Sequence, residues 1–483
     1  MTVPKNNGAF VTGPINMFTL TAAMKENRKQ KSGRVGLWSG FKILFFGLGL
    51  ICCVLTTLAG CGKTPVRHGE ISKIETGELP AKIGSLDWQI LDLRPKASFN
   101  GWQLFGEGAK GHIKGAISFP AAWIREGSIS DLKRKLAETE IIAENLIVYH
   151  AHAGECEPAA ERLASLGYSK IFIYEDFHEW ASNPEYPMEF LPNFEKLVHA
   201  DWLNDLISGK AVPSYSGDKF LVLEVAWGPP DAYNMGHIPG AIHLNTDEIE
   251  SLPAWKFRSD GQIESVLKDI GITRDTLVVV YSNDTSAATR TILCFMRAGV
   301  TDVRLLDGGW NAWTAARHRV ETGTNSRVPV TDTGFRIPVH PEYIVDTAQV
   351  KDLLKQPSIR LATIRKWDEF IGKISGYSYI EAKGSVPGSV WGHDNEELRD
   401  WDGRMADYNK IVALWDEWDI RPDNKTILYC GTGWRASEAW FYTYLMGWPD
   451  VVVYDSGWMD WSLDPSNPIQ TGDPRKTVDS GQK

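Results

Sequence analysis

The sequence predicts an α/β protein built from three tandem doubly wound domains, each with a central, mostly parallel sheet flanked by helices. An apolar run that ends in tyrosine occurs three times, at residues 146–149, 277–281 and 426–429. Each run is followed by a polar loop, a helix-like stretch, a second apolar run and an acidic-aromatic ending. Short apolar runs between helical patterns are typical of buried parallel strands with helices on both faces.

The spacing inside the three repeats is nearly constant. From the strand-end tyrosine to the closing tryptophan (Trp180, Trp313 or Trp461) the distance is 31, 32 and 32 residues. Each repeat also opens with an apolar run and a later glycine-rich segment: 90–94 with 111–117, 221–226 with 236–242, and 359–365 with 384–390. Chance does not keep such a register three times, so the repeats are copies of one structural unit.

The chain length and the turn-rich segments place the domain boundaries. At roughly 150 residues per domain, 483 residues suggest about three domains. We expect a targeting segment over 1–60, then domains over 61–196, 197–337 and 338–483, because boundaries fall near Leu197 and, after the turn-rich stretch 323–338, near Pro338. The short linkers predict domains that pack against one another.

The N-terminal segment has the pattern of an export signal. Residues 25–42 are basic, and residues 43–60 form an apolar run without a charge. The run ends in Leu58-Ala59-Gly60-Cys61, which resembles the bacterial lipobox and implies that Cys61 becomes the lipid-bearing first residue of the mature chain. The alternative is an uncleaved membrane anchor. Both predictions place the body of the protein in the bacterial cell envelope, on the periplasmic or extracellular side. In the first, the lipid is its contact to the membrane.

The net charge argues against a nucleic-acid partner, and the number of cysteines predicts an unpaired thiol. The net charge is −10, so a nucleic-acid partner is not expected, because binding phosphates needs a basic surface. Of six cysteines, Cys52 and Cys53 would leave with the signal and Cys61 would carry lipid. The remaining three are an odd number, so in an oxidising compartment at least one thiol stays unpaired within the chain.

The repeated motifs resemble those of a known family. They are Asp-x-Arg (Asp92 and Arg94 in the first copy), Gly-His-Ile-x-Gly-Ala from Gly111, a strand followed by a loop and a helix, and Asp-Gly-Gly-Trp-x-x-Trp from Asp307 to Trp313. Together they are similar to the rhodanese domain, three times over about 400 of 483 residues. The resemblance implies a sulfurtransferase whose reactive cysteine directly follows the central strand.

Only the third copy keeps a thiol at that position. The residue after the strand-end tyrosine is His150, Ser282 and Cys430 in the three copies. The arginine that ends the first strand, which resembles the substrate-binding arginine of the family, reads Arg94, Ala226 and Arg365. Since the third copy alone keeps both groups, we predict that domain 3 is catalytic and that domains 1 and 2 are inactive.

The loop after the third central strand has the features of an anion-binding nucleophile site. It reads Cys430-Gly431-Thr432-Gly433-Trp434-Arg435, and its glycines allow backbone N–H groups to turn inward. These groups and the following helix N-terminus favour a thiolate. We predict that Cys430 is catalytic and that Gly431, Thr432, Gly433, Trp434, Arg435 and Arg365 bind substrate. The resemblance implies that a basic sixth residue, Arg435, marks the thiosulfate type rather than the 3-mercaptopyruvate type.

The predicted reaction is a two-step transfer of sulfur. The Cys430 thiolate takes sulfane sulfur from a small sulfur-containing anion, thiosulfate or a related donor, and forms a persulfide. A thiol, cyanide or a partner protein then accepts the sulfur. The interpretation includes no metal and no organic cofactor. Cysteine phosphatases of the same fold need one more residue between cysteine and arginine, so the loop length favours sulfur chemistry.

Several residues have a second interpretation. His150, His152 and Cys156 could bind a metal or supply a second thiol, although their spacing favours a degenerate loop. Cys294 lies in an apolar stretch and is expected in the core, and Arg365 could instead pair with Glu369 or Asp368.

A different class of function is a lipid-anchored, non-catalytic rhodanese-repeat protein that binds or assembles partners. In it, Cys430 would be a relic. The third copy departs from the family at Thr363 and at Gly384-Ser385-Val386, and its segment 373–383 is longer than that of the first copy.

Overall fold

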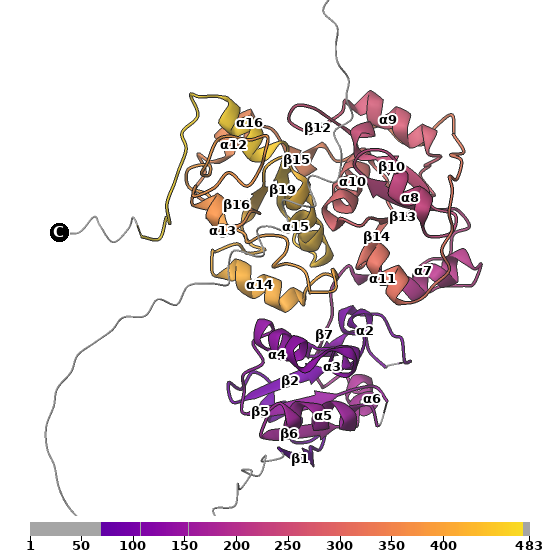
Figure 1. Cartoon of the computed structure of the whole chain (residues 1–483), viewed down its shortest axis with the longest axis vertical. Helices are drawn as coiled ribbons and strands as arrows, with labels where there is room; N and C mark the ends of the chain where they lie inside the picture. Colours follow the sequence, from indigo (N-terminus) through magenta and orange to yellow (C-terminus); the bar gives the residue numbers. More distant parts are fainter. Residues whose placement is uncertain (1–68, 107, 153, 477–483) are drawn as a thin grey trace, which may run out of the picture. The chain divides into compact units, whose positions relative to one another are not determined.

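Each repeat forms its own five-stranded sheet with the same strand order. Figure 1 labels many of the helices and strands. The computed structural model describes residues 69–106, 108–152 and 154–476; the predicted signal segment and Cys61 lie outside them. The first sheet, in spatial order, contains β1 (Glu70–Lys73), β6 (Lys170–Tyr174), β5 (Asn145–Tyr149), β2 (Trp88–Asp92) and β4 (Ile117–Ser118). The second contains β10 (Ile242–Asn245), β9 (Phe220–Ala226), β13 (Leu277–Tyr281), β14 (Val303–Leu306) and β8 (Leu197–Val198). The third contains β15 (Ile344–Val345), β19 (Val451–Tyr454), β18 (Lys425–Tyr429), β16 (Ile359–Thr363) and β17 (Val390–Trp391).

All neighbouring strands in these three sheets run parallel, and helices connect them, which confirms the predicted fold class. Repeat 1 carries α2 (Lys96–Asn100), α3 (Ala121–Glu126), α4 (Ile129–Glu138), α5 (Cys156–Ser165) and α6 (Phe177–Ser182). Repeat 2 carries α7 (Ala200–Ile207), α8 (Asp231–Met235), α9 (Asp260–Asp269), α10 (Thr285–Ala298) and α11 (Gly309–Ala315). Repeat 3 carries α12 (Thr347–Leu353), α13 (Trp367–Phe370), α14 (Tyr408–Asp416), α15 (Trp434–Leu445) and α16 (Gly457–Leu463).

Short elements complete the fold. The 3-10 turns are η1 (Leu79–Lys82), η2 (Phe194–Lys196), η3 (Thr246–Glu248) and η4 (Pro341–Tyr343). Two small antiparallel pairs are β3 (His112–Ile113) with β7 (Met188–Glu189), and β11 (Glu250–Ser251) with β12 (Lys256–Phe257). In the part of the chain that is described, no helix combines the length and the apolar character that a bilayer crossing requires.

The recurring tyrosines tie each glycine-rich segment to its sheet. The hydroxyl groups of Tyr149, Tyr281 and Tyr429 accept hydrogen bonds from the backbone N–H of Ile113, Ile238 and Val386, at 3.2, 3.0 and 3.2 Å. Buried backbone N–H groups need such partners. The constant spacing in the sequence therefore reflects a shared structural role of the tyrosine, present even in the two copies without the thiol.

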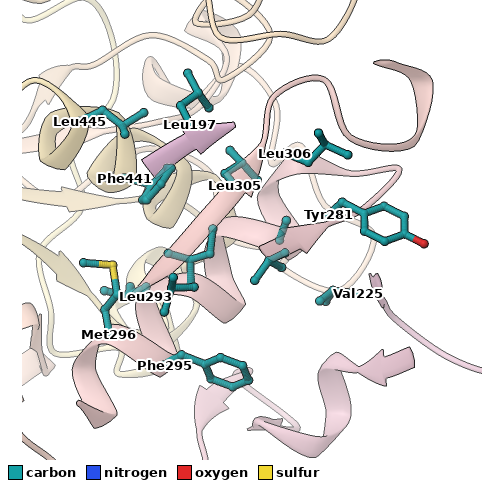
Figure 2. Close-up of a cluster of buried hydrophobic side chains, with 14 of the residues drawn as sticks. Leu197, Val225, Tyr281, Leu293, Phe295, Met296, Leu305, Leu306, Phe441 and Leu445 are labelled. Atoms are coloured by element: carbon teal, nitrogen blue, oxygen red, sulfur yellow. The ribbon is translucent and has the colours of Figure 1, made fainter. Parts of the chain in front are cut away.

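Repeats 2 and 3 share one hydrophobic core. Helices α10 and α15 pack against each other, and Leu293 and Met296 on α10 belong to the same buried cluster as Phe441 and Leu445 on α15 (Figure 2). Because burying apolar surface is the main favourable term in association, this interface holds the two repeats as neighbours, as the short linkers predicted. The interface brings the N-terminal ends of the two helices to the same region, beside Cys430.

Candidate functional site

Cys430 lies where the central strand of repeat 3 gives way to a helix. Strand β18 ends at Tyr429 and α15 begins at Trp434, so the loop between them starts with the thiol. The Cys430 residue is 1 % exposed, and its Sγ accepts a hydrogen bond from the Gly433 backbone N–H at 3.2 Å. Gly433 has a φ of 111°, which favours glycine and turns this N–H toward the sulfur. The loop thus presents a backbone hydrogen-bond donor to the sulfur.

Cys430 lines a cavity of about 840 Å³ between repeats 2 and 3. Repeat 2 contributes Trp227, Trp255, Asn283, Asp284 and Ser286, and repeat 3 contributes Tyr377, Ser378, Tyr379, Asn395, Glu396, Arg399, Cys430, Thr432, Trp434 and Arg435. Among the cysteines that the structure describes, Cys156, Cys294 and Cys430, only Cys430 lines this cavity. The five aromatic rings on its wall give a small molecule an apolar surface next to the reactive sulfur.

Arg435 lines the cavity, but its charge is already compensated. Its Nη1 donates hydrogen bonds to Glu369 Oε2 at 3.0 Å and to Asp394 Oδ2 at 3.1 Å, and its Nη2 donates to Glu369 Oε1 at 2.9 Å. The sequence predicted that Arg435 would hold a dianionic donor. That role stays a prediction; in the structure two carboxylates, both far from Arg435 in the sequence, accept hydrogen bonds from the guanidinium.

Tyr377 is the site residue that the sequence analysis missed. Its hydroxyl oxygen accepts hydrogen bonds from the Gly431 backbone N–H at 2.8 Å and from Arg435 Nη2. With these two bonds accepted, the phenolic proton is the part of the group that can still be donated. Burial raises the pKa of Tyr377, so the phenol keeps this proton at neutral pH. The only signal in the sequence was the extended segment 373–383, which carries Tyr377 to the loop.

The other predicted loop residues divide into two groups. Thr432 and Trp434 line the cavity, and Trp434 Nε1 donates a hydrogen bond to Glu250 Oε1 of repeat 2 at 2.8 Å. Gly431 and Gly433 act through the backbone, and a Cβ on Gly431 would lie only 2.2 Å from the Tyr377 ring. The predicted convergence of loop amides on the sulfur is partial, because the Gly431 N–H serves Tyr377 instead.

Arg365 makes structural contacts away from the cavity, and its predicted role in substrate binding stays a prediction. It is fully buried, and it is absent from the cavity wall. Its Nε donates to Thr363 Oγ1 at 2.8 Å and its Nη2 to the Gly384 carbonyl at 2.9 Å, rather than to Glu369 or Asp368.

The first repeat shows the same arrangement around Arg94. Its Nε donates to Asp92 Oδ1 at 3.0 Å and its Nη2 to the Gly111 carbonyl at 2.6 Å. The arginine therefore ties the first strand to the glycine-rich segment whether or not the repeat has a thiol. Its retention in repeat 3 is not evidence for catalysis.

The corresponding loops of repeats 1 and 2 carry no comparable thiol. His150 and His152 line a separate cavity of about 420 Å³, and the described residues contain no cluster of three metal-ligating side chains. Cys156 begins α5, outside that cavity wall, and burial raises its pKa to about 12. Ser282 Oγ accepts the backbone N–H of Asp284 at 3.0 Å. Cys294 lies in the core on α10, as predicted, with its pKa also raised by burial to about 12.

Comparison with known proteins agrees with this architecture. The model of the rhodanese-like domain matches residues 75–183, 199–316 and 346–464. The chain is 40 % identical over 392 residues to the thiosulfate sulfurtransferase YnjE of Escherichia coli (strain K12), which covers 80 % of this chain and 89 % of the relative. It is 26 % identical over 323 residues to a thiosulfate sulfurtransferase of Corynebacterium glutamicum, covering 60 % of this chain and 97 % of that protein.

Solved structures of EanB show the same fold and bear on the chemistry. Wild-type EanB has a TM-score of 0.80 and 36 % identity, covering 84 % of this chain and 99 % of EanB. Another EanB structure, also with a TM-score of 0.80 and 36 % identity, covers 83 % of this chain and 100 % of EanB and holds a cysteine persulfide with ergothioneine in a tetrahedral intermediate state. These neighbours use a cysteine persulfide. With three matching domains and a catalytic-type loop in the third, the chain belongs to the rhodanese-like family and is a rhodanese-type sulfurtransferase.

Proposed function

We propose that the protein transfers sulfane sulfur through a persulfide on Cys430. The observation that carries the proposal is the position of this thiol, which lies at the end of β18, bonded to the Gly433 N–H and facing the interdomain cavity. The thiolate attacks the outer sulfur of thiosulfate or a related donor. A new S–S bond forms on Cys430, and the bond inside the donor breaks with its electron pair on the leaving group, sulfite in the case of thiosulfate.

The second half of the reaction restores the enzyme. A thiol, cyanide or a protein nucleophile attacks the outer sulfur of the persulfide, and the Cys430 thiolate leaves with the electron pair of the S–S bond. The Gly433 N–H stabilises this thiolate, and Tyr377 can donate its proton to charge that develops on a bound molecule. The relatives named as thiosulfate sulfurtransferases support thiosulfate as the donor to test first.

Mass spectrometry of the intact protein tests this proposal. After exposure to thiosulfate or polysulfide, we expect the mass of one sulfur atom on Cys430, and cyanide should remove it. Cys430→Ser should gain nothing, whereas Cys294→Ser, a matched change at a core cysteine, should behave as the wild type. If the wild type stays unmodified with both donors and with 3-mercaptopyruvate, the proposal is wrong; aryl phosphate hydrolysis that depends on Cys430 would point to a phosphatase instead.

The composition of the cavity favours a second candidate function, sulfur transfer to a cationic aromatic acceptor. Aromatic rings of Trp227, Trp255 and Tyr379 line it together with the carboxylates of Asp284 and Glu396. Such walls attract quaternary ammonium groups through cation–π and charge interactions. EanB has been solved with hercynine and with ergothioneine at 36 % identity to this chain, which supports a betaine of this kind as the acceptor.

Binding measurements separate this candidate from the first. We expect hercynine to quench the cavity tryptophan fluorescence at lower concentration than histidine, which lacks the methylated ammonium. Trp255→Ala should weaken hercynine binding by about 30-fold and leave histidine unchanged, because a desolvated cation–π contact contributes on the order of 2 kcal/mol. Equal affinity for the two compounds would exclude this acceptor class and leave the persulfide proposal intact.

The same proposal includes export and lipid anchoring. Its support is the basic and apolar N-terminal segment with Leu58-Ala59-Gly60-Cys61 at its end. Expression in a bacterial host with labelled palmitate should label the wild type and not Cys61→Ser, and fractionation should find the wild type in the membrane. An unlabelled wild type that remains in the cytoplasmic fraction would refute the anchoring.

A further inference from the structure

A buried ion triad joins repeat 2 to the catalytic loop of repeat 3. Arg290, on α10 of repeat 2, is fully buried. Its Nε donates to Glu250 Oε2 at 3.2 Å, and its Nη2 donates to Asp455 Oδ1 of repeat 3 at 2.6 Å. Burying a charge in a shared core is costly unless partners compensate it, and apolar residues at such positions are often as stable. A gain in stability therefore does not explain the triad Glu250–Arg290–Asp455, and we expect a role for it in the nearby cavity.

The triad holds two tryptophans on the cavity wall, one from each repeat. Glu250 Oε1 accepts the indole N–H of Trp434, in the catalytic loop, at 2.8 Å. Arg290 Nη2 also donates to the backbone carbonyl of Trp255 at 2.8 Å. Both tryptophans line the cavity that contains Cys430. The two sides of the aromatic wall thus depend on the same guanidinium and its carboxylate partner.

The backbone of Trp255 has an unfavourable conformation that its surroundings must hold in place. Trp255 has a φ of 51°, a left-handed conformation that is strained for a bulky side chain. The Arg290 hydrogen bond to its carbonyl holds that conformation, and the ring lies 4.6 Å from the Tyr379 ring across the interface. Strain of this kind persists only where surrounding contacts over-determine it, and it concentrates at ligand sites.

The Arg290 guanidinium also contacts the pair β11–β12 on one side and the catalytic loop on the other. Arg290 stacks over the Phe257 ring at 3.6 Å, and Asp455 Oδ2 accepts the Phe257 backbone N–H at 3.2 Å, so the pair β11–β12 that flanks Trp255 is fixed. On the other side, a Cβ on Gly433 would lie 2.7 Å from Arg290 Nη1. The catalytic loop therefore rests directly on repeat 2.

We propose that Glu250, Arg290 and Asp455 are positioning residues that set the acceptor-binding wall of the cavity through Trp255 and Trp434. The inference rests on the persulfide function proposed above and adds that repeat 2, which has lost the thiol, supplies half of the acceptor site. Donor attack occurs at Cys430, whose bond to the Gly433 N–H does not involve the Glu250 carboxylate. The triad acts on the step in which a large acceptor must lie against the wall.

Half-reaction kinetics with the full chain test the inference. Cyanide is the small acceptor, and the large acceptor is whichever of glutathione and hercynine removes sulfur from the wild-type persulfide faster. In Glu250→Gln and in Trp434→Phe, we expect the KM for the large acceptor to rise by about tenfold, the size expected when a hydrogen bond to a charged group is lost. In Glu250→Gln, persulfide formation and the KM for cyanide should stay within about twofold of the wild type.

A double-mutant cycle shows whether Glu250 and Trp434 affect acceptor binding through the same interaction. Because Glu250 acts through Trp434, Glu250→Gln/Trp434→Phe should raise the KM no further than the worse single variant. The matched control is Arg297→Gln, on the same helix, whose side chain pairs with Asp260 within repeat 2 at 2.7 Å; it should change neither KM. Circular dichroism and thermal unfolding confirm that each variant is folded at the assay temperature.

The outcomes distinguish this inference from the proposed function. A wild type that forms no persulfide refutes the proposed function and with it the basis of the inference. A wild type that forms persulfide, combined with folded variants that leave the KM for the large acceptor unchanged, overturns the inference alone. Equal losses with cyanide and with the large acceptor also overturn it, since they indicate general damage, and so does a persulfide that neither large acceptor removes.

Discussion

The guanidinium of Arg435 lies 2.9 Å from the nearer carboxylate oxygen of Glu369, and this pair changes what the catalytic loop can attract. Glu369 is buried, with 3 % of its side chain exposed, and Asp394 adds a second carboxylate at 3.1 Å. The loop therefore presents a hydrogen-bonding arginine whose positive charge is balanced. Thiosulfate, with two negative charges, meets a less positive site than the loop sequence alone indicates.

Glu369→Gln should strengthen thiosulfate binding while weakening the fold. Removing this carboxylate uncovers positive charge, so we expect the KM for thiosulfate to fall by roughly tenfold at low salt and the effect to shrink as salt is added. Because a buried pair is broken, the free energy of unfolding should fall by about 3 kcal/mol. Steady-state kinetics and urea unfolding measure the two effects. Asp368→Asn, an exposed neighbour paired with Lys373, is the control; an unchanged or higher KM in Glu369→Gln would contradict the charge argument.

Tyr377→Phe should slow sulfur transfer strongly. The substitution removes the oxygen that accepts the Gly431 N–H and Arg435, and it removes the proton that the phenol could donate. We expect the single-turnover rate to fall by about 10²-fold, the usual size for loss of a general acid, and the free energy of unfolding to fall by about 1–3 kcal/mol because two donors lose their acceptor. Tyr379→Phe, on the same cavity wall, should have a much smaller effect. Equal effects of the two substitutions would indicate that the rate of sulfur transfer does not depend specifically on the Tyr377 hydroxyl.

Arg365→Lys should affect stability and not substrate binding. The buried guanidinium joins Thr363 to the Gly384 carbonyl, and lysine cannot make both bonds in that geometry. We expect about 2 kcal/mol lower stability in urea unfolding and an unchanged KM for thiosulfate. Arg94→Lys in repeat 1 should give a similar loss of stability. A large rise in the KM for thiosulfate in Arg365→Lys alone would support the substrate-binding role.

Glu250 should make stability depend on pH near neutrality. Burial raises the pKa of Glu250 from its ordinary value of 4.5 to about 7 in the folded protein. The folded state therefore binds a proton more tightly than the unfolded state, and the stabilisation is fully present below pH 4.5 and lost as the pH rises through about 7. Urea unfolding from pH 5 to 8 should show wild-type stability falling relative to Glu250→Gln. Parallel curves for the two proteins would contradict the raised pKa.

Alkylation should distinguish the three described cysteines. Burial raises the pKa of Cys156 and of Cys294 to about 12, so both remain thiols at pH 8. Cys430, bonded to the Gly433 N–H and open to the cavity, should be the residue that iodoacetamide modifies in the native protein. Peptide mapping after a timed reaction measures this order, and after prior treatment with thiosulfate the label on Cys430 should carry the mass of one additional sulfur atom. Faster labelling of Cys156 would contradict the assignment.

The repeated fold could be read from the sequence because its signals are local and occur three times. The strand runs, the tyrosine that ends each central strand and the closing tryptophan keep their spacing, and the structure gives each copy the same strand order. The loop from Cys430 to Arg435 was equally visible, since catalytic loops of this kind are continuous in sequence.

The partners of the site could not be read in the same way. Glu369 and Asp394 reach Arg435 only after folding, and Tyr377 approaches the loop from a segment without a recognisable motif. The contacts of Arg365 with Thr363 and Gly384 were equally hidden, because a residue can recur for structural reasons that its spacing does not reveal. The contribution of repeat 2 through Glu250 and Trp255 depends on packing between domains, which pattern alone does not specify.

The close approach of Gly433 to Arg290 means that the third repeat is not an independent catalytic module. A fragment that begins near Pro338 would retain the whole hexapeptide and still lose the surface on which that hexapeptide rests, together with half of its aromatic enclosure. Transplanting the loop into another protein would have the same defect. In this chain, a repeat without a thiol of its own supports the catalytic loop of its neighbour, so we expect the smallest active fragment to contain repeats 2 and 3 together.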